Sequence, residues 1–109
     1  MIHYSIWFWL RDGASEQDMI KRINAFLIDQ KNRDAIEGFT LLRNRAPEGK
    51  TQLGPLQALI TFRTAEQFSE AFQEIARAGI HSGLHGSMAE QVSRFQAETF
   101  DVIDVSVCL

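Results

Sequence analysis

The sequence predicts an α+β domain in which one antiparallel sheet of four strands carries two longer helices on one face. Two observations support this fold class. Apolar segments with strand character alternate with segments of helical periodicity, in the order strand, helix, strand, strand, helix, strand. The chain has 109 residues, the length of one domain, so we treat 1–109 as a single domain with one core.

The first predicted strand spans 2–10 and is apolar on both faces. Successive side chains of a strand point to opposite faces. Ile6 and Phe8 therefore lie on one face, and Trp7 and Trp9 lie on the other. Because both faces carry large apolar groups, both should be covered. The helices of the chain can cover only one of them.

Capping residues and apolar stripes mark the two longer helices. Ser15 is the expected cap of the first helix, which we predict over 15–32. Thr64 and Gln67 form a capping box at the start of the second helix, and Gly79 is the type of residue that ends one. The apolar stripe of the first helix is expected to run through Ile20, Ile23, Leu27 and Lys31.

Three further strands are predicted at 39–45, 56–62 and 100–107. The apolar positions Leu84, Met88, Val92 and Phe95 predict a short third helix from 84 to 95. The segment 46–55 holds both prolines and should connect the second and third strands. Asp101 and Asp104 would lie on opposite faces of the last strand, so one carboxylate would face inward and need a partner. The order of elements is the ferredoxin-like βαββαβ arrangement.

Composition and charge narrow the classes of function. The net charge of −3 provides no basic surface, so we expect no nucleic-acid partner. The single cysteine, Cys108, cannot form an internal disulfide, which is typical of a reducing compartment. No apolar run approaches the ~20 residues that span a bilayer, and the N-terminus lacks a basic leader. We therefore expect a cytoplasmic protein that does not associate with membranes.

Three segments resemble a known superfamily. The opening 1–15 resembles a first strand followed by an Asp-Gly-x-Ser start of helix one, and 62–68 resembles the exit from strand three. His81 and His85, followed by an aspartate-bearing last strand, resemble a histidine segment. Together these segments resemble the dimeric α/β-barrel superfamily and, within it, the stress-responsive A/B-barrel (Dabb) proteins. The resemblance implies a homodimeric barrel, and such relatives include monooxygenases, isomerases and polyketide cyclases.

His81 and His85 are the candidate acid–base residues. A spacing of four residues can place two imidazoles on one helix face, where they could bind a metal or act on a proton. Two histidines without a third ligand make a weak metal motif, so we expect no metal and no cofactor. Imidazole accepts a proton near pH 7 because its unperturbed pKa is about 6.5. The resemblance places the second histidine over the cavity, so His85 is favoured and His81 is the alternative. A purely structural role near a helix end is the other interpretation.

The candidate ligand cavity lies between the sheet and the helices. Tyr4 shares the face of Ile6 and should point into this space, where its hydroxyl could hold a carbonyl or phenol oxygen. A core tyrosine bonded to backbone is the competing interpretation. The residues expected to line the cavity for a small hydrophobic or aromatic ligand are Ile6, Phe8, Phe26 and Phe72.

Trp7 and Trp9 predict a homodimer. They lie on the sheet face that the helices leave bare, and a contiguous apolar patch on a soluble protein usually marks an interface. Pairing with a second copy through this face is the simplest way to cover it. The alternative interpretation of the tryptophans is an oxygenase feature.

Three functions are compatible with these observations. The first is a small-molecule-binding protein that acts as a cofactor-independent enzyme, by proton transfer or cyclisation on an aromatic or polyketide-like compound. The second is a non-catalytic, stress-associated dimeric module whose cavity is filled by its own side chains. The third is a cofactor-free monooxygenase. An open cavity of several hundred Å³ would favour an enzyme, and a closed one would favour the module.

Overall fold

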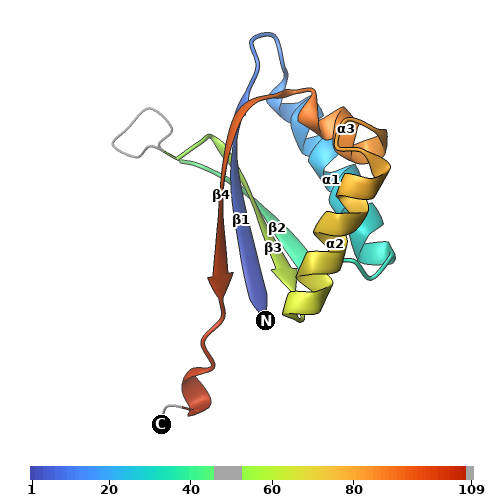
Figure 1. The fold of residues 1–109 in the computed structure, drawn as a ribbon. Helices are drawn as coiled ribbons and strands as arrows, with labels where there is room; N and C mark the ends of the chain where they lie inside the picture. Colours follow the sequence, from blue (N-terminus) through green and yellow to red (C-terminus); the bar gives the residue numbers. More distant parts are fainter. Residues whose placement is uncertain (46–52, 108–109) are drawn as a thin grey trace.

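The chain folds into a single antiparallel sheet with its helices on one face (Figure 1). The structure is a computed structural model that describes residues 1–45 and 53–107. The elements are β1 (Ile2–Leu10), α1 (Glu16–Asn32), β2 (Gly38–Arg43), β3 (Leu56–Phe62), α2 (Ala65–Ala78), α3 (Gly83–Ala89), β4 (Val92–Asp101) and a 3-10 turn, Val105–Val107. The strand order is β2-β3-β1-β4, and each neighbouring pair is antiparallel. The predicted ferredoxin-like α+β fold is therefore confirmed.

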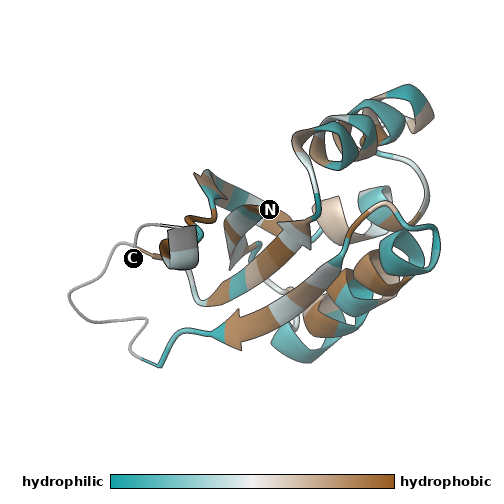
Figure 2. Ribbon diagram, turned by 90° about the horizontal axis from the view of Figure 1, so that it is seen from below, coloured by the Kyte–Doolittle hydropathy of each residue, from teal (hydrophilic) through white to brown (hydrophobic). Residues whose placement is uncertain are grey.

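The core lies between the sheet and α1. Met19, Ile23 and Leu27 of α1 are almost fully buried. In β3, every second side chain from Leu56 to Phe62 is also buried, so one face of this strand packs under the helices. Figure 2 shows apolar residues along the strands and a mixture of apolar and hydrophilic residues on the helices. Burial of each large apolar side chain stabilises the fold by about 1.5–3 kcal/mol.

The caps predicted for the two longer helices are formed. The Ser15 hydroxyl accepts a hydrogen bond from the Asp18 amide at 3.3 Å, and the Thr64 hydroxyl accepts one from the Gln67 amide at 3.0 Å. The Gln67 side chain reaches back to the amide of Arg63, at 2.7 Å, rather than to that of Thr64. Gly79 ends α2 with a φ of 99°, a conformation that favours glycine.

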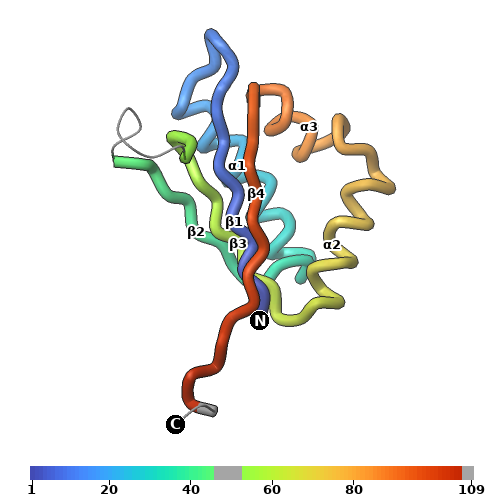
Figure 3. The backbone as a smooth tube through the Cα atoms, turned by 60° about the vertical axis from the view of Figure 1, so that its left-hand side comes forward, coloured from blue at the N-terminus to red at the C-terminus, as the bar shows by residue number. Residues whose placement is uncertain are grey.

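The last strand begins eight residues earlier, and ends six residues earlier, than predicted. β4 covers Val92–Asp101 and pairs with β1 along almost its whole length, whereas Val105–Val107 forms a 3-10 turn beyond the sheet. Figure 3 shows β4 beside β1 and the C-terminal segment leaving the sheet. Val92 and Phe95 have the spacing of helical positions after Met88, but pairing with β1 determines their conformation.

Two smaller predictions are also wrong. β2 ends at Arg43 rather than at 45. Asp101 and Asp104 are both exposed, and Asp104 lies outside the sheet, where its carboxylate accepts hydrogen bonds from Ser106. Asp101 pairs with Ile2 on the helix-facing side of the sheet, but it is exposed to solvent, so neither carboxylate needs a buried partner. Most of the predicted connection 46–55, namely 46–52, lies outside the described residues. None of the described helices is long and apolar enough to cross a bilayer.

Candidate functional site

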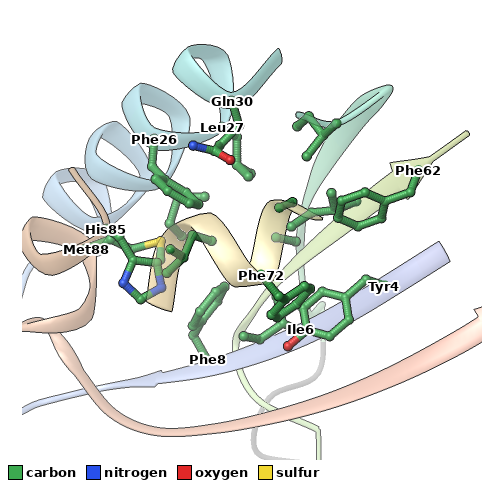
Figure 4. A pocket seen from close by; sticks show the side chains of 16 residues that line it. Tyr4, Ile6, Phe8, Phe26, Leu27, Gln30, Phe62, Phe72, His85 and Met88 are labelled. Carbon is green, nitrogen blue, oxygen red and sulfur yellow. The ribbon is translucent and has the colours of Figure 1, made fainter. Parts of the chain in front are cut away.

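A cavity of about 90 Å³ lies between the sheet and the helices (Figure 4). Side chains from β1, β3, α1, α2 and α3 line it. The lining includes all four side chains expected from the sequence, Ile6, Phe8, Phe26 and Phe72, together with Tyr4 and His85. Phe72 is 40% exposed, so its side chain marks a place where the lining meets solvent.

His85 lies at one end of this cavity with one ring nitrogen already engaged. Its Nδ1 is 2.7 Å from the carbonyl oxygen of Ile80. A carbonyl oxygen can only accept, so Nδ1 carries the proton and donates it in this bond. In the neutral imidazole, Nε2 is then the unprotonated nitrogen, available as an acceptor or base. The Phe26 ring packs edge-on against the imidazole, with centroids 5.3 Å apart, and limits its rotation.

His81 does not share this position. Its side chain is exposed and is not part of the cavity lining. Its backbone has a structural role instead, because a Cβ on Gly86 would lie 2.3 Å from the carbonyl carbon and oxygen of His81. Glycine at 86 therefore permits the chain's own backbone to approach closely. His3 precedes Tyr4 in β1 and therefore lies on the other face of the sheet, so the three histidines do not converge.

Tyr4 contributes a protonated phenol to the cavity. Burial raises the pKa of its hydroxyl above the ordinary value, so the group is neutral and a donor at physiological pH. The ring packs edge-on against Phe72, with centroids 5.2 Å apart, and lies 6.0 Å from Phe68. Its hydroxyl forms no hydrogen bond within the described part of the chain, so the backbone-bonded core tyrosine is not what the structure contains.

Gln30 is a polar lining residue that sequence reasoning missed. It is half-buried in the last turn of α1, and its side-chain amide has no hydrogen-bond partner among residues 1–45 and 53–107. The helical spacing could have predicted this position, because Gln30 follows Leu27 by three residues and Ile23 by seven and so lies on the same stripe of the helix. Lys31, which was predicted to continue that stripe, is exposed.

The outer face of the sheet carries the two tryptophans, opposite the cavity. Trp7 and Trp9 are half-buried, and the guanidinium of Arg94 lies 4.3 Å from the centroid of Trp9. Phe100, which is paired with β1 on this face, is 50% exposed. Leu42 of β2 is 42% exposed on the same face.

Residues 1–45 and 53–107 contain no group of three His, Cys, Asp or Glu side chains that could hold a metal ion.

The comparisons with known proteins identify the family. The chain belongs to DUF6614, a family of unknown function, whose match spans residues 1–102. It has no significant sequence match among curated proteins. Membership of this family therefore assigns the chain to a group of relatives without assigning it an activity.

Three solved structures show how widely this fold is shared. At3g17210 from Arabidopsis thaliana is 12% identical, with a TM-score of 0.74 over 96% of this chain and 98% of that one. A mutant of SnoaB, a cofactor-independent oxygenase from Streptomyces nogalater, is 10% identical, with a TM-score of 0.70 over 94% and 93%. A dimeric ferredoxin-like protein of unknown function from a Jannaschia species is 15% identical, with a TM-score of 0.67 over 93% and 98%. At these identities the likeness establishes the fold alone.

Proposed function

We propose that this chain is a homodimeric, small-molecule-binding protein of the cytoplasm whose cavity performs cofactor-independent acid–base chemistry. The reaction class is proton transfer or cyclisation on an aromatic or polyketide-like compound. The observation that carries the proposal is the state of His85: Nδ1 donates to the Ile80 carbonyl, which leaves Nε2 as a base beside an apolar cavity.

The side chains of the cavity can divide the work of a proton transfer. His85 Nε2 takes a proton from a carbon next to a carbonyl, and the electron pair of the broken C–H bond moves to the carbonyl oxygen as an enolate. The Tyr4 hydroxyl, a neutral donor without a protein partner, stabilises that oxygen by a hydrogen bond. In an isomerisation, the imidazolium then returns its proton to a carbon of the enolate. In a cyclisation, the enolate carbon attacks a second carbonyl and closes a ring, and the imidazolium gives its proton to the resulting alkoxide oxygen.

The homodimer is part of the same proposal. Its support is the outer sheet face with Trp7 and Trp9, and the description of the similar Jannaschia protein as dimeric. The resemblance of the His81–His85 segment to Dabb proteins points the same way.

The size of the cavity favours a second candidate. Ligand sites usually enclose about 300–1,000 Å³, and this cavity has about 90 Å³. A non-catalytic, stress-associated dimeric module, whose cavity is largely filled by its own aromatic side chains, fits that volume. The enzyme requires Phe72, which is partly exposed, to move aside when a ligand enters. A cofactor-free monooxygenase is the third candidate, supported by the similar fold of SnoaB, a cofactor-independent oxygenase. Trp7 and Trp9 would not serve such an activity in this cavity, because they lie on the other face of the sheet.

Phenylacetone is a suitable probe because it joins an aromatic ring to a ketone with a weakly acidic C–H bond. We expect the wild-type protein to bind it and to accelerate exchange of that hydrogen for deuterium, as followed by NMR in D₂O. The variant His85→Ala should lose the exchange, Tyr4→Phe should slow it by about 10²-fold, and His81→Ala should behave like wild type. Binding without exchange would support a small-molecule site but contradict the acid–base chemistry. The absence of both would contradict the small-molecule proposal and favour the non-catalytic module with a filled cavity.

A further inference from the structure

α3 carries His85 but has few means of holding its own position. It has seven residues, of which Gly83 and Gly86 are glycines, and its N-cap, Ser82, makes no side-chain capping bond. Helices this short are not stable by themselves in water, and each internal glycine weakens them by about 1 kcal/mol. Contacts from outside α3 must therefore fix its orientation, and with it the ring of His85.

Arg22, in the middle of α1, supplies the main polar contact to α3. Its Nη1 donates to the Ser87 carbonyl oxygen at 2.7 Å and reaches the Glu90 carboxylate at 2.5 Å. Its Nε donates to Asp18 at 2.8 Å, which holds the guanidinium in place on α1. The Arg22 side chain is only 27% exposed. One side chain thus ties the end of α3 to α1 through Ser87 and Glu90.

The hydrogen bond to the Ser87 carbonyl makes Arg22 a cap of the C-terminal end of α3. Carbonyls in the last turn of a helix lack intrahelical donors, and a cation near them also interacts favourably with the helix dipole. The Gly86 and Met88 carbonyls accept from Glu90 and Gln91 of the chain itself. The Ser87 carbonyl accepts from Arg22. Arg22 therefore caps the C-terminal turn of α3 from another helix.

We propose that Arg22 is the positioning residue of His85: by capping α3 from α1, it keeps Nε2 of His85 directed at the cavity. This inference rests on the proposed role of His85 as the base. Ser87 follows His85 by two residues, and hydrogen bonds from Gly86 to Ser82 and from Glu90 to Gly86 make the short helix a single unit. A tilt at Ser87 therefore moves the imidazole, and displacements near 1 Å are enough to reduce a catalytic rate.

Arg33, the C-cap residue of α1, provides a matched control. It forms an ion pair with Asp29 one turn earlier, at 3.1 Å, and its side chain is 62% exposed. Its side chain has no contact with α3 among the interactions of the described residues. Arg33→Met therefore removes a guanidinium and an i,i+4 ion pair from α1 without touching α3, whereas Arg22→Met removes the cap.

The test uses two readouts on the full chain. The first is the ¹⁵N NMR spectrum of the imidazole rings, which reports which nitrogen of His85 carries the proton. The second is phenylacetone exchange. In Arg22→Met we expect altered His85 signals and an exchange rate reduced by about tenfold, with a folded spectrum elsewhere. Arg22→Lys should restore part of both, because lysine keeps the charge but not the fork of donors. Arg33→Met should match wild type.

The outcomes separate this inference from the proposed function. Unchanged His85 signals in folded Arg22→Met would overturn the positioning role, even if the wild type catalyses exchange. Altered signals with a lowered rate support it. If Arg22→Met does not fold, Glu90→Gln removes a single acceptor charge, and it should shift the same His85 signals to a smaller extent; no shift there would also overturn it. Wild-type protein without any exchange would contradict the proposed function, while the ring signals would still test whether Arg22 holds His85.

Discussion

The two faces of β1 differ strongly in how far the rest of the chain buries their side chains. On the helix face, Phe8 is 3% exposed and packs in the core with Met19 and Ile23. On the outer face, Trp7 and Trp9 are half-buried, and Phe100, on the neighbouring strand, is 50% exposed. The chain's own helices cover the first face, and none of the described helices α1, α2 and α3 covers the second. Burial on the helix face is therefore a folding contribution, whereas the outer face can gain apolar contact mainly by association.

The helix layer itself stops short of the sheet edge. Phe8 and Phe95 are direct neighbours on β1 and β4 and share a face, yet Phe95 is 63% exposed. Figures 1 and 3 show α2 lying away from β4. Two phenylalanines of one cross-strand pair thus differ in burial because the covering layer ends between their strands.

The largest expected effect is the loss of folding stability when the two paired phenylalanines, Phe8 and Phe95, are truncated. Phe8→Ala should lower the free energy of unfolding by about 3–5 kcal/mol, because it removes a buried ring and leaves a cavity. Phe95→Ala should change it by less than about 0.5 kcal/mol, as is usual at exposed positions. Urea unfolding of both variants measures the difference. Equal losses would mean that Phe95 is covered in solution and that the helix layer extends over β4.

The next largest expected effect is on self-association through the outer face of the sheet. Trp9→Glu should weaken self-association by about 2 kcal/mol or more, since interfaces depend on buried aromatic anchors. The new carboxylate would lie beside Arg94, so the separate chains should stay folded. Sedimentation equilibrium should give about twice the 12.4 kDa chain mass for wild type and a lower mass for the variant. Ile80→Glu, at a 51% exposed apolar residue beyond the end of α2, is the control. A monomeric wild type at micromolar concentration would refute the interface.

The smallest expected effect is a loss of folding stability at low pH, caused by carboxylates paired with arginines at the edges of the helix layer. Arg63 lowers the pKa of Asp34, and Arg22 lowers that of Glu90, from ordinary values of 3.8 and 4.5. Carboxylates with lowered pKa values stabilise the fold above those ordinary values, and the contribution is lost as the pH falls through the folded pKa. Thermal unfolding should therefore show a stability decline below about pH 4.5 that is shallower in Arg63→Met. An identical decline in the variant would exclude the Arg63–Asp34 pair as a cause.

Several elements were predictable from sequence because their signals are local. β1 and β3 are marked by β-branched and aromatic runs, and α1 and α2 by the caps Ser15 and Thr64. Each signal acts within a few residues, through backbone amides that a nearby hydroxyl can satisfy or through alternation of side chains. The placement of Tyr4, Ile6, Phe8, Phe26 and Phe72 on one cavity follows from the same periodicities.

The features that sequence reasoning missed depend on segments that are distant in the chain. The spacing of Met88, Val92 and Phe95 fits a helix, and only the hydrogen bonds with β1 make 92–101 a strand. Likewise, both His81 and His85 were candidates from spacing. In the structure, His85 lines the cavity together with side chains of α1, α2 and the sheet, whereas His81 is exposed, so the packing of α3 against distant elements separates the two. Local propensity determines which segments form helices and strands, whereas pairing and packing between distant segments decide where a strand begins and which side chain meets the cavity.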